Sequence, residues 1–168
     1  LDPVLGDHGK LYSAITSEHV SAMKELTRYA RYLLPNITEA CVLTDTPYQE
    51  DFSENDIAAI AAKLHAMGPK YIVITGIRKD DLFVNYLSEA SDSDASRHHM
   101  DSIAFPVAGT SRPGTGDIFG SVLVSCILKG QPLKHSVWKA ARFVADCIKA
   151  SDDRNLPPIE GTCFELLL

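Results

Sequence analysis

The stretch Arg112–Ser121, RPGTGDIFGS, leads through two glycines, a threonine and an aspartate into IFGSVLVSCIL, an apolar run typical of a helix. Glycine is unfavourable inside a helix, but at its entrance it lets the backbone turn sharply. The first amide groups of a helix have no partner within it, and the helix dipole makes them attractive to anions. The stretch therefore indicates either an anion site or, more simply, a helix whose first-turn acid complements the dipole.

Helices and strands alternate along the rest of the chain. The helix over 115–128 is separated by Gly130-Gln131-Pro132 from a second helix over 133–150. Upstream, KYIVITG at 70–76 is a continuous apolar run bounded by turn residues, as in a buried parallel strand. The remaining expected elements are a helix capped by Thr16 or Ser17, a strand over 32–34, a short helix capped by Thr38, a helix that begins at Ser53, and strands over 81–88 and 98–107.

This alternation predicts an α/β fold with three layers and a mainly parallel sheet. A chain of 168 residues with 45% hydrophobic content suits a single domain over 1–168. The polar connection EASDSDASR at 89–97 is expected to be exposed and mobile.

Composition narrows the classes of partner. The net charge of −6 argues against a nucleic-acid or anionic-membrane surface, because both require a basic face. No apolar run is long enough to span a bilayer, and no charged-then-apolar leader opens the chain. For these two reasons we expect a cytoplasmic protein. The four cysteines form no C-x-x-C pair, so we expect them to be reduced and structural.

Polar loops adjoin three other apolar runs, at 2–7, at 36–39 and at Thr75-Gly76. In α/β proteins, sites form at the carboxyl ends of strands, where acids suit a magnesium ion that bridges nucleotide phosphates. Each acid also has a simpler interpretation, Glu39 as a first-turn helix acid and Asp7 as a turn residue. Taken with GTGD, the loops favour phosphoryl transfer, in which helix amides hold the phosphoryl group and Asp117 accepts a proton from an attacking hydroxyl.

Four segments in this order, DPVLGDHGKLY (2–12), LPNITEA (34–40), VITG (73–76) and RPGTGDIFGSVL (112–123), resemble the C-terminal part of a pyridoxal kinase of the ribokinase superfamily. The resemblance implies a ribokinase-like fold that lacks its N-terminal strands and helices. It also implies ATP-dependent phosphorylation of the 5′-hydroxyl of pyridoxal, pyridoxine or pyridoxamine, in vitamin B6 salvage, with Mg²⁺.

The resemblance also assigns roles to residues. It makes Asp117 the catalytic base, in contact with the vitamin. The nucleotide would be contacted by Tyr12, Asn36, Thr75, Gly114, Thr115 and Gly116. Magnesium would be organised by Asp7 and Glu39, with Asp2 close by.

Two alternatives stay open. A hydroxymethylpyrimidine kinase of the same superfamily commonly shows cysteine where this chain has Asp117. A non-catalytic fragment that binds nucleotide or packs against a partner would explain the start at LDPV. Because the first βαβ units of pyridoxal kinases carry much of the vitamin pocket, we expect residues 1–168 alone to be inactive. The resemblance also implies that the full-length protein is a homodimer.

Three other features have structural explanations. His98 and His99 are adjacent on a predicted strand and point to opposite faces, so they make a poor metal pair. Trp138 is expected to pack or to be partly exposed, and Arg78-Lys79 to form a solvated turn.

Overall fold

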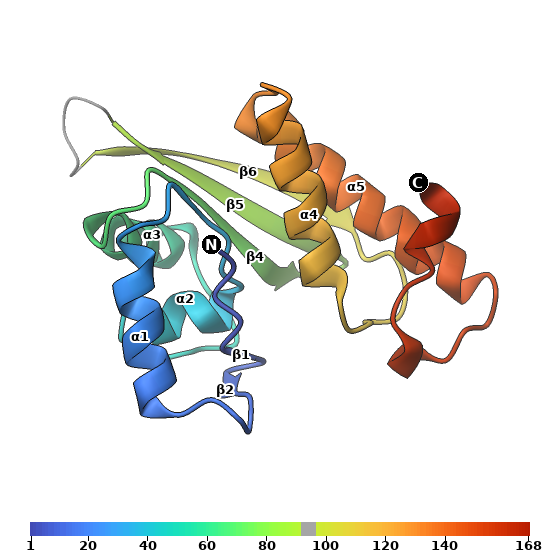
Figure 1. The fold of residues 1–168 in the computed structure, drawn as a ribbon, viewed down its shortest axis with the longest axis horizontal. Coiled ribbons are helices and arrows are strands. Elements are labelled where there is room, and N and C mark those ends of the chain that lie inside the picture. The colour runs from blue at the N-terminus through green and yellow to red at the C-terminus, as the bar shows by residue number, and fades with distance from the viewer. Residues whose placement is uncertain (92–96) are drawn as a thin grey trace. The chain divides into compact units, whose positions relative to one another are not determined.

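The computed structural model describes residues 1–91 and 97–168, which form two compact units (Figure 1). Unit 1 comprises Leu1–Ile77 with Val84–Ser102, and unit 2 comprises Arg78–Phe83 with Ile103–Leu168. Most of the connection expected to be mobile, residues 92–96, lies outside the described residues.

The N-terminal elements follow the predicted order closely. They are β1 (Gly6–Asp7), β2 (Lys10–Leu11), α1 (Ser17–Thr27), β3 (Tyr32–Leu33), α2 (Ile37–Leu43), α3 (Glu54–Ala66), β4 (Tyr71–Lys79), β5 (Leu82–Ala90) and β6 (His98–Pro106). Thr16, one of the two predicted candidates, caps α1, and Ser53 caps α3 as predicted. Helix α2, however, is capped by Asn36 and not by Thr38.

The sheet has the strand order β3-β4-β5-β6 and is mixed. Strand β3 is parallel to β4, with Tyr32 opposite Tyr71. Strand β5 runs back along β4, because the Ala90 amide at its end donates to Lys70 O just before β4, at 3.0 Å. The expectation of a mainly parallel sheet was therefore wrong.

The physical reason is the connection between β4 and β5. It consists of Asp80 and Asp81, and Asp80 has a φ of 53°. Two residues can join antiparallel strands, whereas a parallel pair needs a long crossover. Strand β4 also continues to Lys79, so Arg78 and Lys79 lie in a strand and not in the predicted turn.

The core of unit 1 packs the apolar face of α3 against the sheet. Ile57, Ile60 and Leu64 from the helix are completely or almost completely buried, as are Leu33, Ile72 and Ile74 from strands β3 and β4. Burial of each such side chain contributes about 1.5–3 kcal/mol to folding. Leu33 lies just before the loop to α2, and Ile74 lies just before Thr75, so this core holds the segments that carry the candidate site.

Unit 2 is built on two helices that lie side by side, α4 (Thr115–Leu128) and α5 (Leu133–Asp152) (Figure 1). They end close to the predicted bounds. Two short 3₁₀ helices follow, η1 (Pro158–Glu160) and η2 (Phe164–Leu167). Trp138 is 43% exposed beside Phe105 and His135, so the prediction of a partly exposed ring is confirmed.

The cysteines are free, and Cys41, Cys126 and Cys147 are buried, as expected. His99 is exposed, whereas the half-buried His98 packs its ring 5.4 Å from that of His65. Across residues 1–91 and 97–168, no helix combines the length and hydropathy that crossing a bilayer requires.

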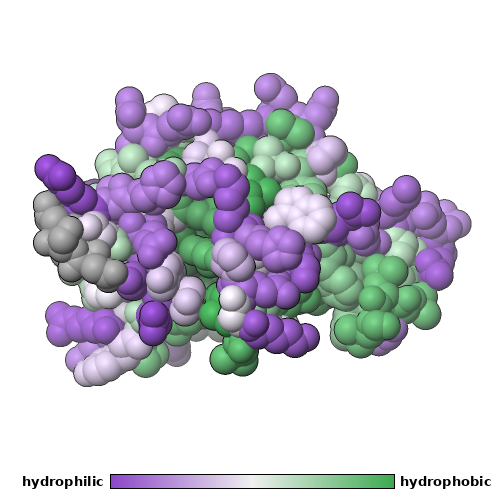
Figure 2. All heavy atoms as spheres, turned by 90° about the horizontal axis from the view of Figure 1, so that it is seen from above, coloured by the Kyte–Doolittle hydropathy of each residue, from purple (hydrophilic) through white to green (hydrophobic). Residues whose placement is uncertain are grey.

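Polar and charged residues cover much of the face in Figure 2, with apolar residues exposed between them. The most exposed large apolar side chains are Tyr29, Leu128, Ile159 and Leu168. Each lies near the end of a helix or in the C-terminal segment, where single exposed apolar side chains are common.

Candidate functional site

The Gly6–Leu11 segment forms a tight hairpin that presents Asp7. Its two turn residues, His8 and Gly9, have φ values of 49° and 74°, the combination that two-residue hairpins require. A Cβ on Gly6 would lie 2.2 Å from Lys10 O, so the strands approach too closely for any other residue. The side chain of Asp7 is 52% exposed, and its Oδ1 accepts the amide of His8 at 2.8 Å.

Three side chains at the start of α2 hold this hairpin and the residue before it. Asn36 Nδ2 donates to Gly6 O at 2.8 Å, and Thr38 Oγ1 accepts the Gly9 amide at 3.0 Å. Glu39 Oε1 accepts the Leu5 amide at 3.1 Å. The N-x-T-E sequence therefore acts first as a positioning element for the loop that carries Asp7.

Glu39 is 4% exposed, and both of its oxygens accept backbone amides. Oε2 accepts the amide of Asn36 at 2.8 Å, while Asn36 Oδ1 accepts the amide of Glu39 at 2.9 Å, which completes a capping box. Burial raises the pKa of Glu39 to about 7, against the opposing effect of the amides of Asn36, Leu5 and Gly6, and the charge of Asp2 adds to the rise. Because the charge of Asp2 acts on Glu39, Asp2 also lies near this loop.

The middle of β4 meets the cap of α2 at the same place. Asn36 and Thr75 form a parallel β-bridge, and the Thr75 amide donates to Pro35 O at 2.9 Å. Tyr12 follows the hairpin, is 47% exposed, and donates its amide to Leu5 O at 3.0 Å. Unit 1 thus brings together the predicted residues Asp2, Asp7, Tyr12, Asn36, Glu39 and Thr75.

Among the described residues of unit 1, the carboxylates do not cluster closely enough to enclose a metal by themselves. Within residues 1–91 and 97–168, no group of three or more His, Cys, Asp and Glu side chains could hold an ion. Magnesium, however, is often held by one or two carboxylates together with waters and substrate phosphates. The half-exposed carboxylate of Asp7 suits that mode, and the oxygens of Glu39 each keep a second lone pair for a metal-bound water.

Unit 2 carries the other predicted residues, Gly114 to Asp117, at the start of α4. Gly114 precedes the helix with a φ of 81°, a left-handed conformation that favours glycine. The first bond within the helix runs from the Ile118 amide to Gly114 O at 3.2 Å. The amides of Thr115, Gly116 and Asp117 precede it and point beyond the helix.

Open space surrounds this helix start. A Cβ on Gly114 or on Gly116 would meet no atom within 4 Å, and Asp117 is exposed. Thr115 Oγ1 donates to Arg112 O at 3.2 Å, which ties the first turn to the preceding loop. An anionic group can therefore approach the amides beside a free carboxylate, the arrangement that phosphoryl transfer to a hydroxyl requires.

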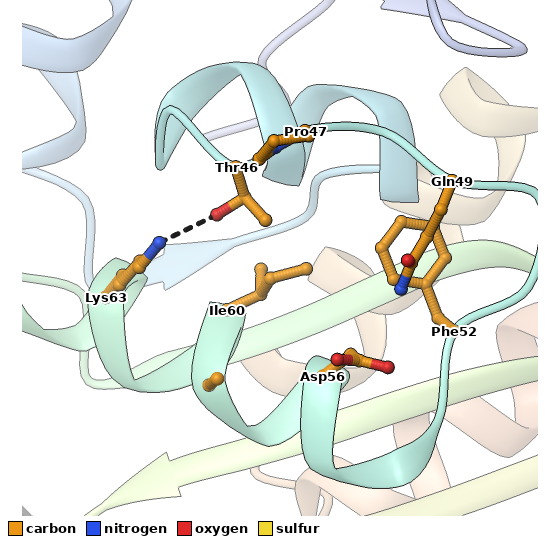
Figure 3. Close-up of a pocket in the computed structure, with 8 residues that line it drawn as sticks. Thr46, Pro47, Gln49, Phe52, Asp56, Ile60 and Lys63 are labelled. Atoms are coloured by element: carbon orange, nitrogen blue, oxygen red, sulfur yellow. Dashed lines mark hydrogen bonds between the residues drawn. The ribbon is translucent and has the colours of Figure 1, made fainter.

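A pocket of about 220 Å³ lies elsewhere in unit 1, between the loop after α2 and helix α3 (Figure 3). It contains none of the predicted site residues. Its charged side chains already have partners, since Lys63 Nζ donates to Thr46 Oγ1 at 2.9 Å and Asp56 completes the cap of α3 with Ser53. We assign no ligand to it.

The sequence model of the phosphomethylpyrimidine kinase family matches residues 1–158. The chain belongs to this family. Among curated relatives, a pyridoxine kinase from Bacillus subtilis is 27% identical over 90% of this chain and 54% of its own length. The chain thus spans about half the length of the curated relatives it matches.

Solved structures agree with this membership. A protein of Bacteroides thetaiotaomicron described as a phosphomethylpyrimidine kinase superposes with a TM-score of 0.89 at 29% identity, over 98% of this chain and 56% of that one. The pyridoxal kinase of Leishmania donovani, solved with ADP and pyridoxine, has a TM-score of 0.79 at 28% identity, over 92% of this chain and 49% of that one. Both share the mixed α/β fold described above.

Sequence reasoning missed several residues that shape these loops. Thr38 was predicted only as a helix cap, although its position in N-x-T-E could have suggested a bond to a neighbouring loop. Arg112 and Asp152 are 40 residues apart and carry no local signal of their pairing.

Proposed function

We propose that the protein is a pyridoxal kinase, which transfers the γ-phosphoryl group of ATP to the 5′-hydroxyl of pyridoxal, pyridoxine or pyridoxamine. The observation that carries the proposal is Asp117, an exposed carboxylate in the first turn of α4 beside amides without intrahelical partners. Hydroxymethylpyrimidine kinases commonly have cysteine at this position. The relative with pyridoxine and ADP bound supports the same assignment.

In the proposed reaction, Asp117 takes the proton of the vitamin's 5′-hydroxyl group while the oxygen of that hydroxyl attacks the γ-phosphorus of ATP. The new O–P bond forms while the bond from the γ-phosphorus to the bridging oxygen of ATP breaks, and ADP leaves. The amides of Gly114, Thr115 and Gly116 donate to oxygens of the transferring phosphoryl group and of the nucleotide phosphates beside it. Such positioned donors and a positioned proton acceptor are the main contributions of an enzyme to phosphoryl transfer.

Unit 1 supplies the nucleotide and metal contacts in this proposal. Tyr12, Asn36 and Thr75 contact ATP. Asp7 and Glu39, with Asp2 close by, organise Mg²⁺, which supplies charge neutralisation of the nucleotide phosphates. The hydrogen bonds from Asn36, Thr38 and Glu39 to the hairpin support this role because they fix where Asp7 lies.

The homodimer and the cytoplasmic location expected from the sequence remain part of the proposal. Light scattering on the intact protein measures the first, and fractionation of cells measures the second.

The proposed function is tested by a comparison of acceptors. The intact protein is incubated with ATP and Mg²⁺ together with either pyridoxal or hydroxymethylpyrimidine, and ADP formation is followed. We expect a higher kcat/KM for pyridoxal. Preference for hydroxymethylpyrimidine would assign the related kinase activity instead, and no turnover with either would favour the non-catalytic alternative.

A further inference from the structure

Arg112 is a buried cation just before the glycine-rich helix start. Its side chain is 1% exposed, although it lies only two residues from Gly114. The guanidinium donates five hydrogen bonds, to Asp152 Oδ1 (2.6 and 3.3 Å), Leu156 O (2.9 Å), Pro157 O (3.3 Å) and Gly161 O (2.8 Å). All three of its nitrogens are engaged, and each acceptor belongs to the end of α5 or to the segment after it.

Asp152 is the second half of this arrangement. Its Oδ1 accepts from Arg112, while its Oδ2 accepts the amide of Thr110 at 3.0 Å. A Cβ on Gly109 would lie 2.1 Å from Oδ2, so the loop backbone lies directly against the carboxylate. The hydrogen bond from Arg112 keeps the pKa of Asp152 below its usual range, so the carboxylate stays ionised at neutral pH.

These contacts fix the loop before α4 at both of its ends. Thr110 and Arg112 are tied to α5, and Thr115 Oγ1 donates back to Arg112 O. On the far side, Pro113 O lies 3.3 Å from where a Cβ of Gly161 would be. The direction of the amides at the start of α4 is therefore set by a partly buried ion pair and not by the glycines alone.

Because its donors are all used, Arg112 has none left for a phosphate, so its charge does not act on a ligand directly. We propose that Arg112 and Asp152 form a positioning pair, which holds the loop so that the amides of Thr115 and Gly116 and the carboxylate of Asp117 lie in reactive geometry. This inference rests on the proposed function and extends it to two residues outside the GTGD sequence.

The test uses two conservative variants of the intact protein, Arg112→Lys and Asp152→Asn. Lysine keeps the positive charge, but its ammonium group cannot replace a planar guanidinium that donates to one carboxylate and three backbone carbonyls at once. The matched controls are Arg142→Lys and Asp146→Asn, which alter an exposed ion pair of 2.9 Å on α5, the helix that ends at Asp152. The folded fraction of each variant is measured first by thermal unfolding, and rates are expressed per folded molecule.

We expect Arg112→Lys and Asp152→Asn to lower kcat by ~10²-fold, since small displacements of reacting groups have effects of this size. The KM for pyridoxal should change little. Affinity for ADP should fall while affinity for adenosine stays, because only the phosphates meet the loop amides. If the pair had only a structural role, the affinities for ADP and for adenosine would fall together. The control variants should match the wild type.

Turnover per folded molecule equal to that of the control variants would overturn the positioning pair and leave the proposed function intact. If the wild type forms no pyridoxal 5′-phosphate but binds ADP, the proposed function fails, and the ADP and adenosine affinities still decide the role of the pair. If the wild type binds no ADP, both are overturned.

Discussion

Glu39 accepts the amide of Leu5 at 3.1 Å, a bond that joins the start of α2 to the loop 34 residues before it. The other oxygen of the same carboxylate accepts the amide of Asn36 at the helix cap. One side chain therefore fixes both a helix start and the loop that leads to Asp7. Glu39 therefore supports the loop that carries the predicted metal ligand Asp7.

Glu39→Gln is expected to lower both stability and metal use. Glutamine has one acceptor oxygen, so one of the two amides faces an NH₂ group, and leaving a buried amide unpaired costs about 1–3 kcal/mol of unfolding free energy. The Mg²⁺ concentration for half-maximal rate should rise more than the KM for pyridoxal. Urea unfolding and a Mg²⁺ titration measure these effects.

The control is Glu25→Gln, which changes an exposed acid on α1. If Glu39→Gln matches that control in both measurements, Glu39 has neither of the roles assigned to it.

Thr38→Val should weaken nucleotide use with little change in the helix itself. Valine has nearly the same shape, but it leaves the Gly9 amide without its 3.0 Å acceptor, at a cost of about 1 kcal/mol. The hairpin that carries Asp7 then loses one of its three anchors, so the KM for Mg·ATP should rise. Thr27→Val is the control, because the hydroxyl of that buried threonine bonds only within α1, to Met23 O. An equal KM in the two variants would rule out an anchoring role for Thr38.

Gly116→Ala should separate stability from activity. No atom lies within 4 Å of the added methyl group, and alanine favours helix formation by about 0.5–1 kcal/mol over glycine in a helix interior. The melting temperature should therefore stay the same or rise, while turnover falls because the methyl group stands where a phosphoryl group would approach. Ser121→Ala, one turn further along α4, should keep full turnover. Normal kinetics for Gly116→Ala would mean that no ligand comes close to this glycine.

His65 should make stability depend on pH below neutrality. Burial lowers the pKa of His65, and His98 lowers it further, although Nδ1 lies 2.8 Å from Pro69 O, which opposes the shift. Because the folded-state pKa is depressed, the unfolded chain binds more protons, and the stability present above the unfolded pKa of about 6.5 is lost as pH falls through the folded value.

The urea midpoint of the wild type should therefore drop between pH 7.5 and pH 5 by more than that of His65→Gln. His99→Gln, which changes an exposed histidine, should keep the full drop. Equal drops in the wild type and in both variants would remove His65 as the cause.

Much of this structure could be predicted from local patterns, for reasons visible in particular residues. Apolar spacing and caps located α1, α3, α4 and α5. These signals are local, since Ser53 caps the helix that directly follows it and the apolar run from Ile118 lies within α4 itself. The mixed sheet was missed because a two-residue turn at Asp80 and Asp81 reverses the chain, and such a turn needs neither glycine nor proline. Asn36 and Glu39 were interpreted as ligand contacts, or for Glu39 as a first-turn helix acid, and not as hairpin anchors, because long-range hydrogen bonds leave no periodic signal.

The measurement that tests the central claim most directly is ATP-dependent formation of pyridoxal 5′-phosphate by the intact protein and by its Asp117→Asn variant. If Asp117 is the catalytic base, the substitution should lower turnover by ~10²–10⁴-fold and leave ADP affinity nearly unchanged. Glu54→Gln, which alters an exposed first-turn acid of α3, should behave as the wild type. Pyridoxal 5′-phosphate formation by Asp117→Asn at the wild-type rate would contradict the account.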